Sequence, residues 1–227
     1  TSGERHPHLG QLSASTDGAA DDDDGGGDPH TLTERLRARL HDRVSYVGTP
    51  DYGVEGCAPG HYRSVFVVRA DDARQTLGEF DGARFAFNEP LSQSGWAAPQ
   101  THAAKLGLQL PPAVQTGAHR LSAQAVAEGR ADIAALDAVT FALMQDADPV
   151  HARLRVVGMT DPTPGLPLIT ASDQDPGPIF AAVADAIAAL PADDRVSLRL
   201  KGIVQVPVAD YLAVPNPPAP EQIAGSD

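Results

Sequence analysis

Residues 84–96 read RFAFNEPLSQSGW, and this stretch decides the fold. Its apolar beginning is typical of a buried strand, its middle has the composition of a turn, and Ser92-Gln93-Ser94-Gly95 begins an amphipathic pattern that continues to about Leu106. The same order recurs twice: strands are expected over residues 113–116 and 133–136, followed by helices over 120–128 and 138–145. Strand–turn–helix units in series build a parallel sheet, so we predict an α/β fold.

The polar residues that follow these strands are candidates for a ligand site. Ligands of parallel sheets bind beyond the carboxyl ends of the strands, where Ser92, Ser94, His119 and Asp137 fall. The first turn of a helix has backbone N–H groups without partners and carries partial positive charge. Two facing helix starts, with these serines, the ring of His119 and the hydroxyl of Ser122, would bind a compact oxyanion without any lysine.

Each candidate also has a purely structural explanation. Ser92 and Ser94 fit the pattern of a helix N-cap, and His119 fits a partly buried histidine at a helix start. Asp137 could equally cap the third helix or contact the ligand. The recurrence of such residues at the same topological position favours the ligand site.

These motifs resemble a known family. Residues 88–95, 117–122 and 125–137 are similar to the phosphate/phosphite/phosphonate substrate-binding proteins of bacterial ABC transporters. Members of that family have the two-lobed fold of type 2 periplasmic binding proteins. Residues 48–65 resemble the first-lobe segment that faces the pocket, and residues 160–167 resemble the return crossover between the lobes.

The resemblance implies which residues bind the ligand. Ser92, Gln93, Ser94 and His119 would hold the oxyanion from one lobe, and Tyr62 would close on it from the other. An acidic residue contacts the amine of amine-bearing phosphonates in relatives, and Asp137 would take that role here. The resemblance also implies a periplasmic or otherwise extracytoplasmic location and an ABC-transporter permease as partner.

Two lobes with mixed or parallel sheets, flanked by helices, follow from the same resemblance. The first lobe is expected over residues 31–80 and 166–227, and the second over residues 81–165. Within the first lobe, a helical connection is expected at residues 72–80 and a Pro-rich tail from residue 214.

The N-terminal part of the chain differs from relatives. Residues 1–30 are rich in Gly and Asp with few apolar residues, so we expect a disordered acidic tail. Relatives have a strand and a helix before the segment that begins at Val44, whereas only one short helix is expected here, at residues 33–40. The first lobe is therefore expected to be truncated at its N-terminus.

Composition excludes several kinds of partner. The net charge of −13 disfavours nucleic acid and anionic membranes, which select basic surfaces. No apolar window reaches the roughly 18 residues of a membrane span, and no signal peptide is recognised. Cys57 is the only cysteine, which excludes an intrachain disulfide. We expect a monomer that needs no metal and no cofactor.

Three functions are compatible with these patterns. The leading hypothesis is a non-catalytic protein that closes two lobes around phosphate, phosphite or a phosphonate for an ABC importer. An enzyme on the same fold would need a base near the reacting carbon, and His119 with Asp137 is the only pair that could provide one. No Walker loop, dinucleotide fingerprint or nucleophile elbow is present. A ligand-sensing domain of a signalling partner is the third alternative.

Overall fold

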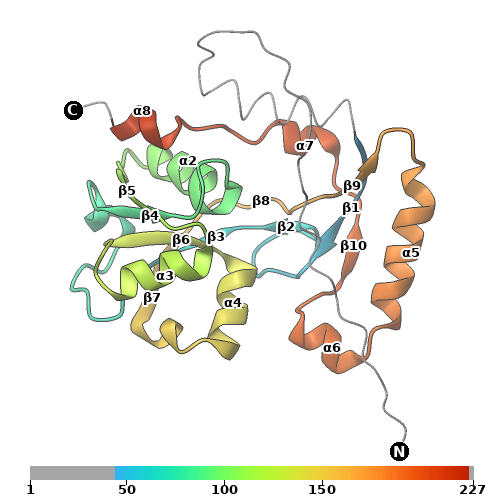
Figure 1. The fold of residues 1–227 in the computed structure, drawn as a ribbon, viewed down its shortest axis with the longest axis horizontal. Helices are drawn as coiled ribbons and strands as arrows, with labels where there is room; N and C mark the ends of the chain where they lie inside the picture. Colours follow the sequence, from blue (N-terminus) through green and yellow to red (C-terminus); the bar gives the residue numbers. More distant parts are fainter. Residues whose placement is uncertain (1–43, 225–227) are drawn as a thin grey trace, which may run out of the picture.

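The computed structural model describes residues 44–224, which form two α/β lobes joined by a short two-stranded connection (Figure 1). The acidic tail expected at residues 1–30, the helix expected at residues 33–40 and the truncation expected before Val44 lie outside the described residues.

The second lobe is built on a mixed five-stranded sheet with the order β5-β4-β6-β3-β7. Strand β4 runs parallel to β5 and β6, as the three strand–turn–helix units predict, while β3 pairs antiparallel with β6 and β7. The strands are β3 (Ser64–Arg69), β4 (Phe85–Phe87), β5 (Pro112–Gln115), β6 (Ile133–Asp137) and β7 (Leu154–Met159).

Helices cover both faces of this sheet (Figure 1). Helices α3 (His119–Ala127) and α4 (Ala138–Ala147) pack on one face, and η3 (Pro149–Arg153) follows α4. The π-helical turn η2 (Gln93–Ala97) continues into α2 (Ala98–Lys105) on the other face. Gly129 ends α3 with a φ of 75°, a left-handed conformation that only glycine adopts readily.

Strand β3 corrects the predicted division of the chain. Residues 64–80 are expected in the first lobe, but β3 lies between β6 and β7, and η1 (Leu77–Phe80) packs into the same core. The apolar residues of β3 alternate between the two faces: Val65 packs with α3 and α4, and Phe66 packs with η1 and η2. Covered faces on both sides explain why β3 is apolar almost without interruption.

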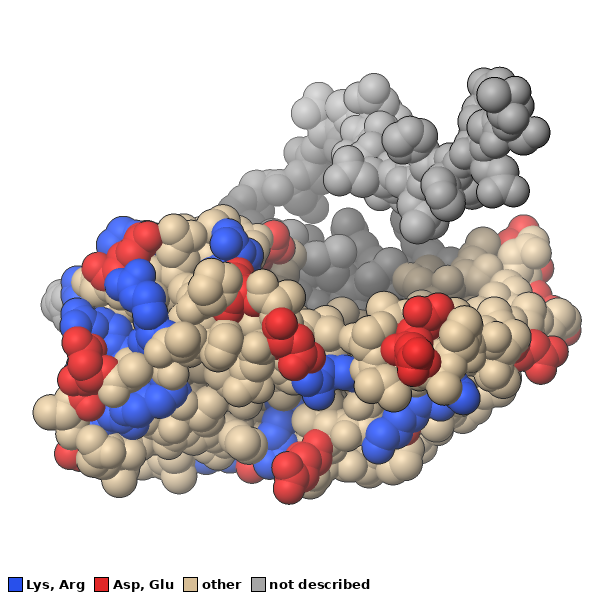
Figure 2. Space-filling model, turned by 90° about the horizontal axis from the view of Figure 1, so that it is seen from below, with Lys and Arg blue, Asp and Glu red and all other residues tan. Residues whose placement is uncertain are grey.

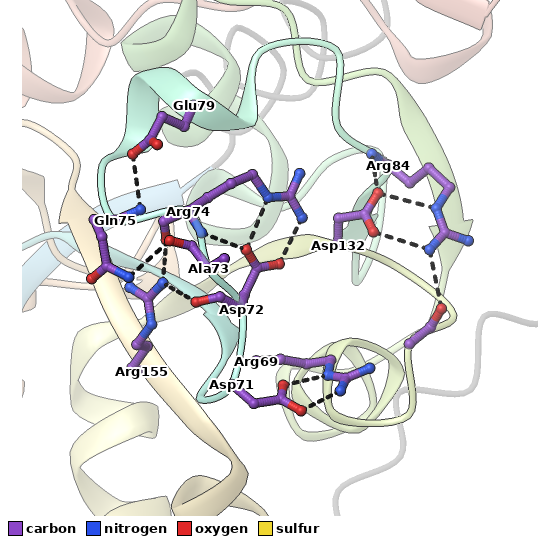
Figure 3. A network of polar contacts seen from close by, with 11 residues as sticks. Arg69, Asp71, Asp72, Ala73, Arg74, Gln75, Glu79, Arg84, Asp132 and Arg155 are labelled. Carbon is purple, nitrogen blue, oxygen red and sulfur yellow. Dashed lines mark hydrogen bonds and ion pairs between the residues drawn. The ribbon is translucent and has the colours of Figure 1, made fainter.

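The connection from β3 to η1 is not the helix expected there, because charged side chains bind its backbone (Figure 3). The carboxylate of Asp72 accepts hydrogen bonds from the N–H of Arg74 at 2.9 Å and from its guanidinium. Arg155 donates to the carbonyl of Asp72 at 3.0 Å, and Glu79 accepts from the N–H of Gln75 at 2.8 Å. Backbone groups that are satisfied in this way do not need helical partners.

The first lobe is built on a three-stranded antiparallel sheet with the order β10-β1-β9. Its strands are β1 (Val44–Asp51), β9 (Leu168–Ala171) and β10 (Gly202–Val204), and its helices are α5 (Pro176–Ala189), α6 (Ala192–Ser197) and α7 (Val208–Leu212). Gly48 lets α5 approach β1, because a Cβ there would lie 2.8 Å from Phe180 and from Ile203.

Three segments of the described chain join the lobes. Strands β2 (His61–Tyr62) and β8 (Thr163–Pro164) pair antiparallel between them. After α7 the chain returns to the second lobe, where α8 (Pro220–Ala224) lies near β5 and Ile223 packs against the core (Figure 1). The indole N–H of Trp96 donates to the carbonyl of Pro218 at 3.1 Å. The end of the chain, expected in the first lobe, thus belongs partly to the second.

Charged side chains of both signs are mixed on one face of the molecule (Figure 2). On the face drawn in Figure 2, Lys and Arg side chains alternate with Asp and Glu, and no continuous basic area forms there. None of the helices within residues 44–224 is both long enough and apolar enough to cross a bilayer.

Candidate functional site

A cavity of about 640 Å³ lies between the two lobes. Its walls come from the first-lobe sheet and α7, from the β2–β8 connection, and from the two helix starts that follow β4 and β5. Five of the predicted site residues line it: Tyr62, Ser92, Gln93, Ser94 and His119.

The two helix starts meet at this cavity, as the sequence predicts. The hydroxyl oxygen of Ser94 lies 2.9 Å from Nε2 of His119. The parallel pairing of β4 and β5 continues beyond both strands, because the N–H of Gly117 donates to the carbonyl of Asn88 at 2.9 Å. This pairing holds the turn before α3 beside the turn before η2.

Ser92 is the N-cap of the first helix start. Its hydroxyl oxygen accepts from the N–H of Gly95 at 3.0 Å, and its carbonyl accepts from the N–H of Trp96 and of Ala97, both at 3.0 Å. The structural explanation of Ser92 is therefore right, but it does not exclude binding. A hydroxyl that accepts through its oxygen still carries a hydrogen that can be donated to a ligand.

Gly95 is required by the close approach of Asn88. A Cβ at Gly95 would collide with Oδ1 of Asn88 and would lie 3.2 Å from the hydroxyl of Ser92. Asn88 also lines the cavity, and its Oδ1 is buried with no hydrogen-bond partner among the described residues. The sequence motif contains Asn88, so this contributor to the site was detectable from the sequence although it was not among the predicted ligands.

The second helix start exposes backbone donors. The first hydrogen bond within α3 runs from the N–H of Ser122 to the carbonyl of Ala118 at 2.9 Å, so the helix does not use the N–H groups of residues 119–121. Ala118 has no side chain that could cap them. Donors of this kind, together with the helix dipole, favour an anion at the start of α3.

The surroundings of His119 favour the neutral form of its ring. Burial lowers the pKa of its ring, although the negative charge of Asp137 and the backbone of Ala135 oppose this shift. Its Nδ1 is buried and has no hydrogen bond of ordinary geometry within the described part of the chain. A neutral imidazole can still donate one hydrogen bond to an oxyanion, and a bound anion would favour its protonated form.

Two predicted ligand residues do not reach the cavity. Ser122 is completely buried, and its hydroxyl pairs with that of Thr116 at an oxygen–oxygen distance of 2.7 Å. Asp137 is the N-cap of α4, where its carboxylate accepts from the N–H of Thr140 at 2.8 Å. Neither residue lines the space between the lobes. These positions differ from the expectation that both residues contact the ligand. Of the two roles considered for Asp137, the structure shows the helix cap.

Sequence reasoning missed most of the first-lobe wall. Tyr46 and Tyr211 line the cavity with their rings, whose centroids are 5.8 Å apart. The hydroxyl of Tyr46 lies 2.7 Å from that of Thr49 and accepts from the N–H of Val206 at 2.9 Å. Residues 44–47 read VSYV, which is typical of a strand, so the sequence held a usable signal for Tyr46, whereas Tyr211 comes from a C-terminal helix that carries no motif.

The hydroxyl of Tyr211 is also held by the protein. It donates to the carbonyl of Gly165 at 2.9 Å and contacts the hydroxyl of Thr49. Burial raises the pKa of Tyr211 to about 12, so this side chain stays neutral. Both tyrosines therefore present ring surface rather than hydroxyl groups to the cavity.

The lining is almost free of charge. Among the described residues that line the cavity, Glu89 alone has a carboxylate, and none is Lys or Arg. No group of His, Cys, Asp and Glu side chains within residues 44–224 could hold a metal ion. An anion bound here would be held by neutral donors, as the sequence predicts.

The sequence model of one family matches residues 36–211, most of the chain: the ABC-transporter phosphonate periplasmic substrate-binding proteins. The chain belongs to this family. No curated protein matches the chain.

Solved structures share the two-lobed fold. A Prochlorococcus marinus protein in complex with methylphosphonate has a TM-score of 0.61 and 15% identity, over 80% of this chain and 78% of its own. A binding protein component of a Pseudomonas aeruginosa ABC phosphonate transporter has a TM-score of 0.59 and 19% identity, over 78% and 61% respectively. A Xanthomonas citri protein bound to ATP has a TM-score of 0.59 and 15% identity, over 82% and 80%. At such identities the similarity shows the fold, which is that of the periplasmic binding proteins.

Proposed function

We propose that this phosphonate-family protein captures a small phosphorus oxyanion between its two lobes and passes it to the permease of an ABC importer. Phosphate, phosphite and phosphonates share the compact group of oxygen atoms that the helix starts of η2 and α3 suit. The protein would act outside the cytoplasm, as periplasmic substrate-binding proteins do.

One observation carries this proposal: Ser94 and His119, from two different helix starts, lie 2.9 Å apart at the wall of the cavity between the lobes. Their polar groups can bind neighbouring oxygen atoms of one tetrahedral anion. Hydrogen bonds to charged groups contribute about 1.5–3 kcal/mol each. Four or five of them supply the roughly 8 kcal/mol of a micromolar complex after ordering costs.

Closure of the lobes would complete the site. Tyr62 lies in β2, one of the two strands of the connection, and lines the cavity although only 5% of its surface is exposed. Rotation about β2 and β8 would move the first-lobe wall towards the anion held by η2 and α3. Such hinge closure is a common response of two-lobed binding proteins to their ligands.

The enzyme alternative loses one member of its proposed pair in this geometry. It called for His119 with Asp137 near the reacting carbon, and His119 lines the cavity, but the carboxylate of Asp137 caps α4 and lies outside the lining. The family itself is one of substrate-binding proteins.

Isothermal titration tests the proposal with phosphate, phosphite, methylphosphonate and 2-aminoethylphosphonate. We expect at least one of them to bind with a micromolar or lower Kd, and the double variant Ser94→Ala/His119→Ala to abolish binding. Absence of binding by all four ligands and by any larger phosphonate, or unchanged binding by the double variant, would refute the assignment.

A further inference from the structure

We infer that the preferred ligand is a phosphonate or phosphate monoester whose organic body is uncharged, apolar and larger than a methyl group. This inference rests on the proposed function and deepens it. It follows from the contrast between the two walls of the same cavity.

Apart from Leu91, the described residues of the second-lobe wall are polar, and this wall suits an oxyanion. It presents the hydroxyls of Ser92 and Ser94, the ring of His119 and the side chain of Asn88, next to the backbone donors of two helix starts. A phosphonate group placed here finds several donors at once.

The first-lobe wall is apolar. On the sheet, Tyr46 of β1 pairs with Ile169 of β9, so their side chains are neighbours across the strands. The other apolar members of this wall are Val44, Leu166, Val208, Leu212 and Val214. Leu166 is 73% exposed and Leu212 is 53% exposed, although a soluble domain gains free energy by covering such side chains.

The hydroxyls that this wall contains are turned away from the ligand. Those of Tyr46 and Tyr211 are both held by Thr49, which is completely buried, and by backbone groups behind the wall. The two rings therefore act as flat apolar surfaces, which suit an alkyl or aryl group.

Bare phosphate fits this cavity poorly. If the lobes closed on it, the oxygen atoms that face the first lobe would meet, among residues 44–224, apolar side chains and hydroxyls that are already bonded within the wall. Burying a polar atom without a partner is unfavourable. An apolar body in that position would instead remove hydrocarbon from water on both sides. The volume of about 640 Å³ is also that of a site for an organic molecule, for which about 300–1,000 Å³ is typical.

Within the described part of the chain, a cationic body finds no buried counter-charge in the lining. Glu89 is the one carboxylate among the described lining residues and is exposed, and Asp137 is engaged at the start of α4. These placements favour an uncharged body over an amine-bearing one.

The test compares ligands that share a head group. We expect the full chain to bind hexylphosphonate at least tenfold more tightly than methylphosphonate in calorimetric titration, and to bind hexanol without detectable heat. Tenfold corresponds to about 1.4 kcal/mol.

Paired variants locate the effect. Leu212→Ser, in the apolar wall, should lower the ratio of hexylphosphonate to methylphosphonate affinity at least threefold. Leu198→Ser is the matched control, because Leu198 is 50% exposed, close to the 53% of Leu212, and lies outside the cavity lining. This control should leave the ratio unchanged.

The possible outcomes separate this inference from the proposed function. If methylphosphonate binds as tightly as hexylphosphonate, the apolar wall does not contribute to ligand affinity. The inference is then wrong, while the proposed function stands. The inference also fails if hexanol binds as well as hexylphosphonate, or if both leucine variants change the ratio equally. If no phosphonate binds at all, the proposed function itself is refuted.

Discussion

Replacing Ser94 with alanine is the sharpest test of the anion site. The Ser94 hydroxyl lines the cavity 2.9 Å from Nε2 of His119, and it is placed to donate to a ligand oxygen. A hydrogen bond to a charged group contributes about 1.5–3 kcal/mol, and each 1.4 kcal/mol changes an equilibrium about tenfold. We therefore expect the Kd for the tightest-binding oxyanion to rise roughly 10- to 150-fold.

The unliganded protein should tolerate this change. Ser94→Ala removes one neutral hydrogen bond to His119 at a cavity wall, where a water molecule can replace the hydroxyl. Such a bond contributes about 0.5–1.5 kcal/mol, which corresponds to a loss of about 1–6 °C in Tm for a domain of this size. Affinity should thus fall far more than stability.

Titration calorimetry and thermal melts of the same samples separate the two effects, and Ser122→Ala provides the matched control. Ser122 also loses a hydroxyl hydrogen bond, to Thr116, but it is completely buried outside the cavity lining. Its variant should be destabilised and should keep its affinity within about twofold. Unchanged binding by Ser94→Ala, or an equal loss of affinity in both variants, would refute the reasoning.

Three further predictions concern the surroundings of the site. Gly95→Ala places a Cβ against Oδ1 of Asn88. Urea denaturation should show a free energy of unfolding lower by about 1–3 kcal/mol, as is typical of overpacking, and titration should show weaker oxyanion binding. A variant as stable as the parent would contradict the close contact. Burial lowers the pKa of His119, so as the pH falls below about 6.5 the unfolded chain takes up a proton that the folded chain does not. The free energy of unfolding of the unliganded protein should therefore decrease on acidification, by at most about 1.4 kcal/mol per pH unit from this group, and His119→Gln should flatten the curve; identical curves would disprove this origin. Asp137→Ala removes the N-cap hydrogen bond to Thr140 and should lower stability by about 0.5–2 kcal/mol. The ratio of 2-aminoethylphosphonate to ethylphosphonate affinity should stay constant in competition titrations. A change in that ratio would mean that Asp137 contacts the ligand.

Local signals predicted the parallel part of the second lobe. The strands β4, β5 and β6 are short apolar runs, and Gly129 ends α3 with the positive φ that such a helix end requires. Ser92 and Ser94 also follow from local sequence, because a small polar residue at the start of a helix has few alternatives to capping it or facing outward. These features need no knowledge of distant partners.

Features that depend on distant partners were beyond local reasoning. The apolar sequence of β3 indicates burial but not the sheet in which it is buried, and its partners β6 and β7 lie far along the chain. The backbone between β3 and η1 is held by Arg155, which no local pattern connects to it. Ser122 illustrates a finer limit: it lies in the first turn of the expected helix, yet the direction of its side chain places it against Thr116 instead of the ligand.

The first-lobe wall was missed for a related reason. Leu166, Ile169 and Tyr211 come from a loop, a strand and a helix that carry no binding motif, and only the fold gathers them opposite the helix starts. A search for polar ligands of an anion also gives no weight to apolar residues, although these decide what else the ligand must contain.

The return of the C-terminal segment to the second lobe sets a geometric limit on opening. Residues 213–219 leave α7 on the first lobe, and α8 is anchored near β5, one of the two edge strands of the larger sheet. Wide separation of the lobes must either extend residues 213–219 or pull Pro218 away from the indole of Trp96. The length of residues 213–219, rather than the bending of β2 and β8, would then limit how far the lobes separate. Trp96 is the only tryptophan of the chain, so a change in its fluorescence would report the loss of its hydrogen bond to Pro218.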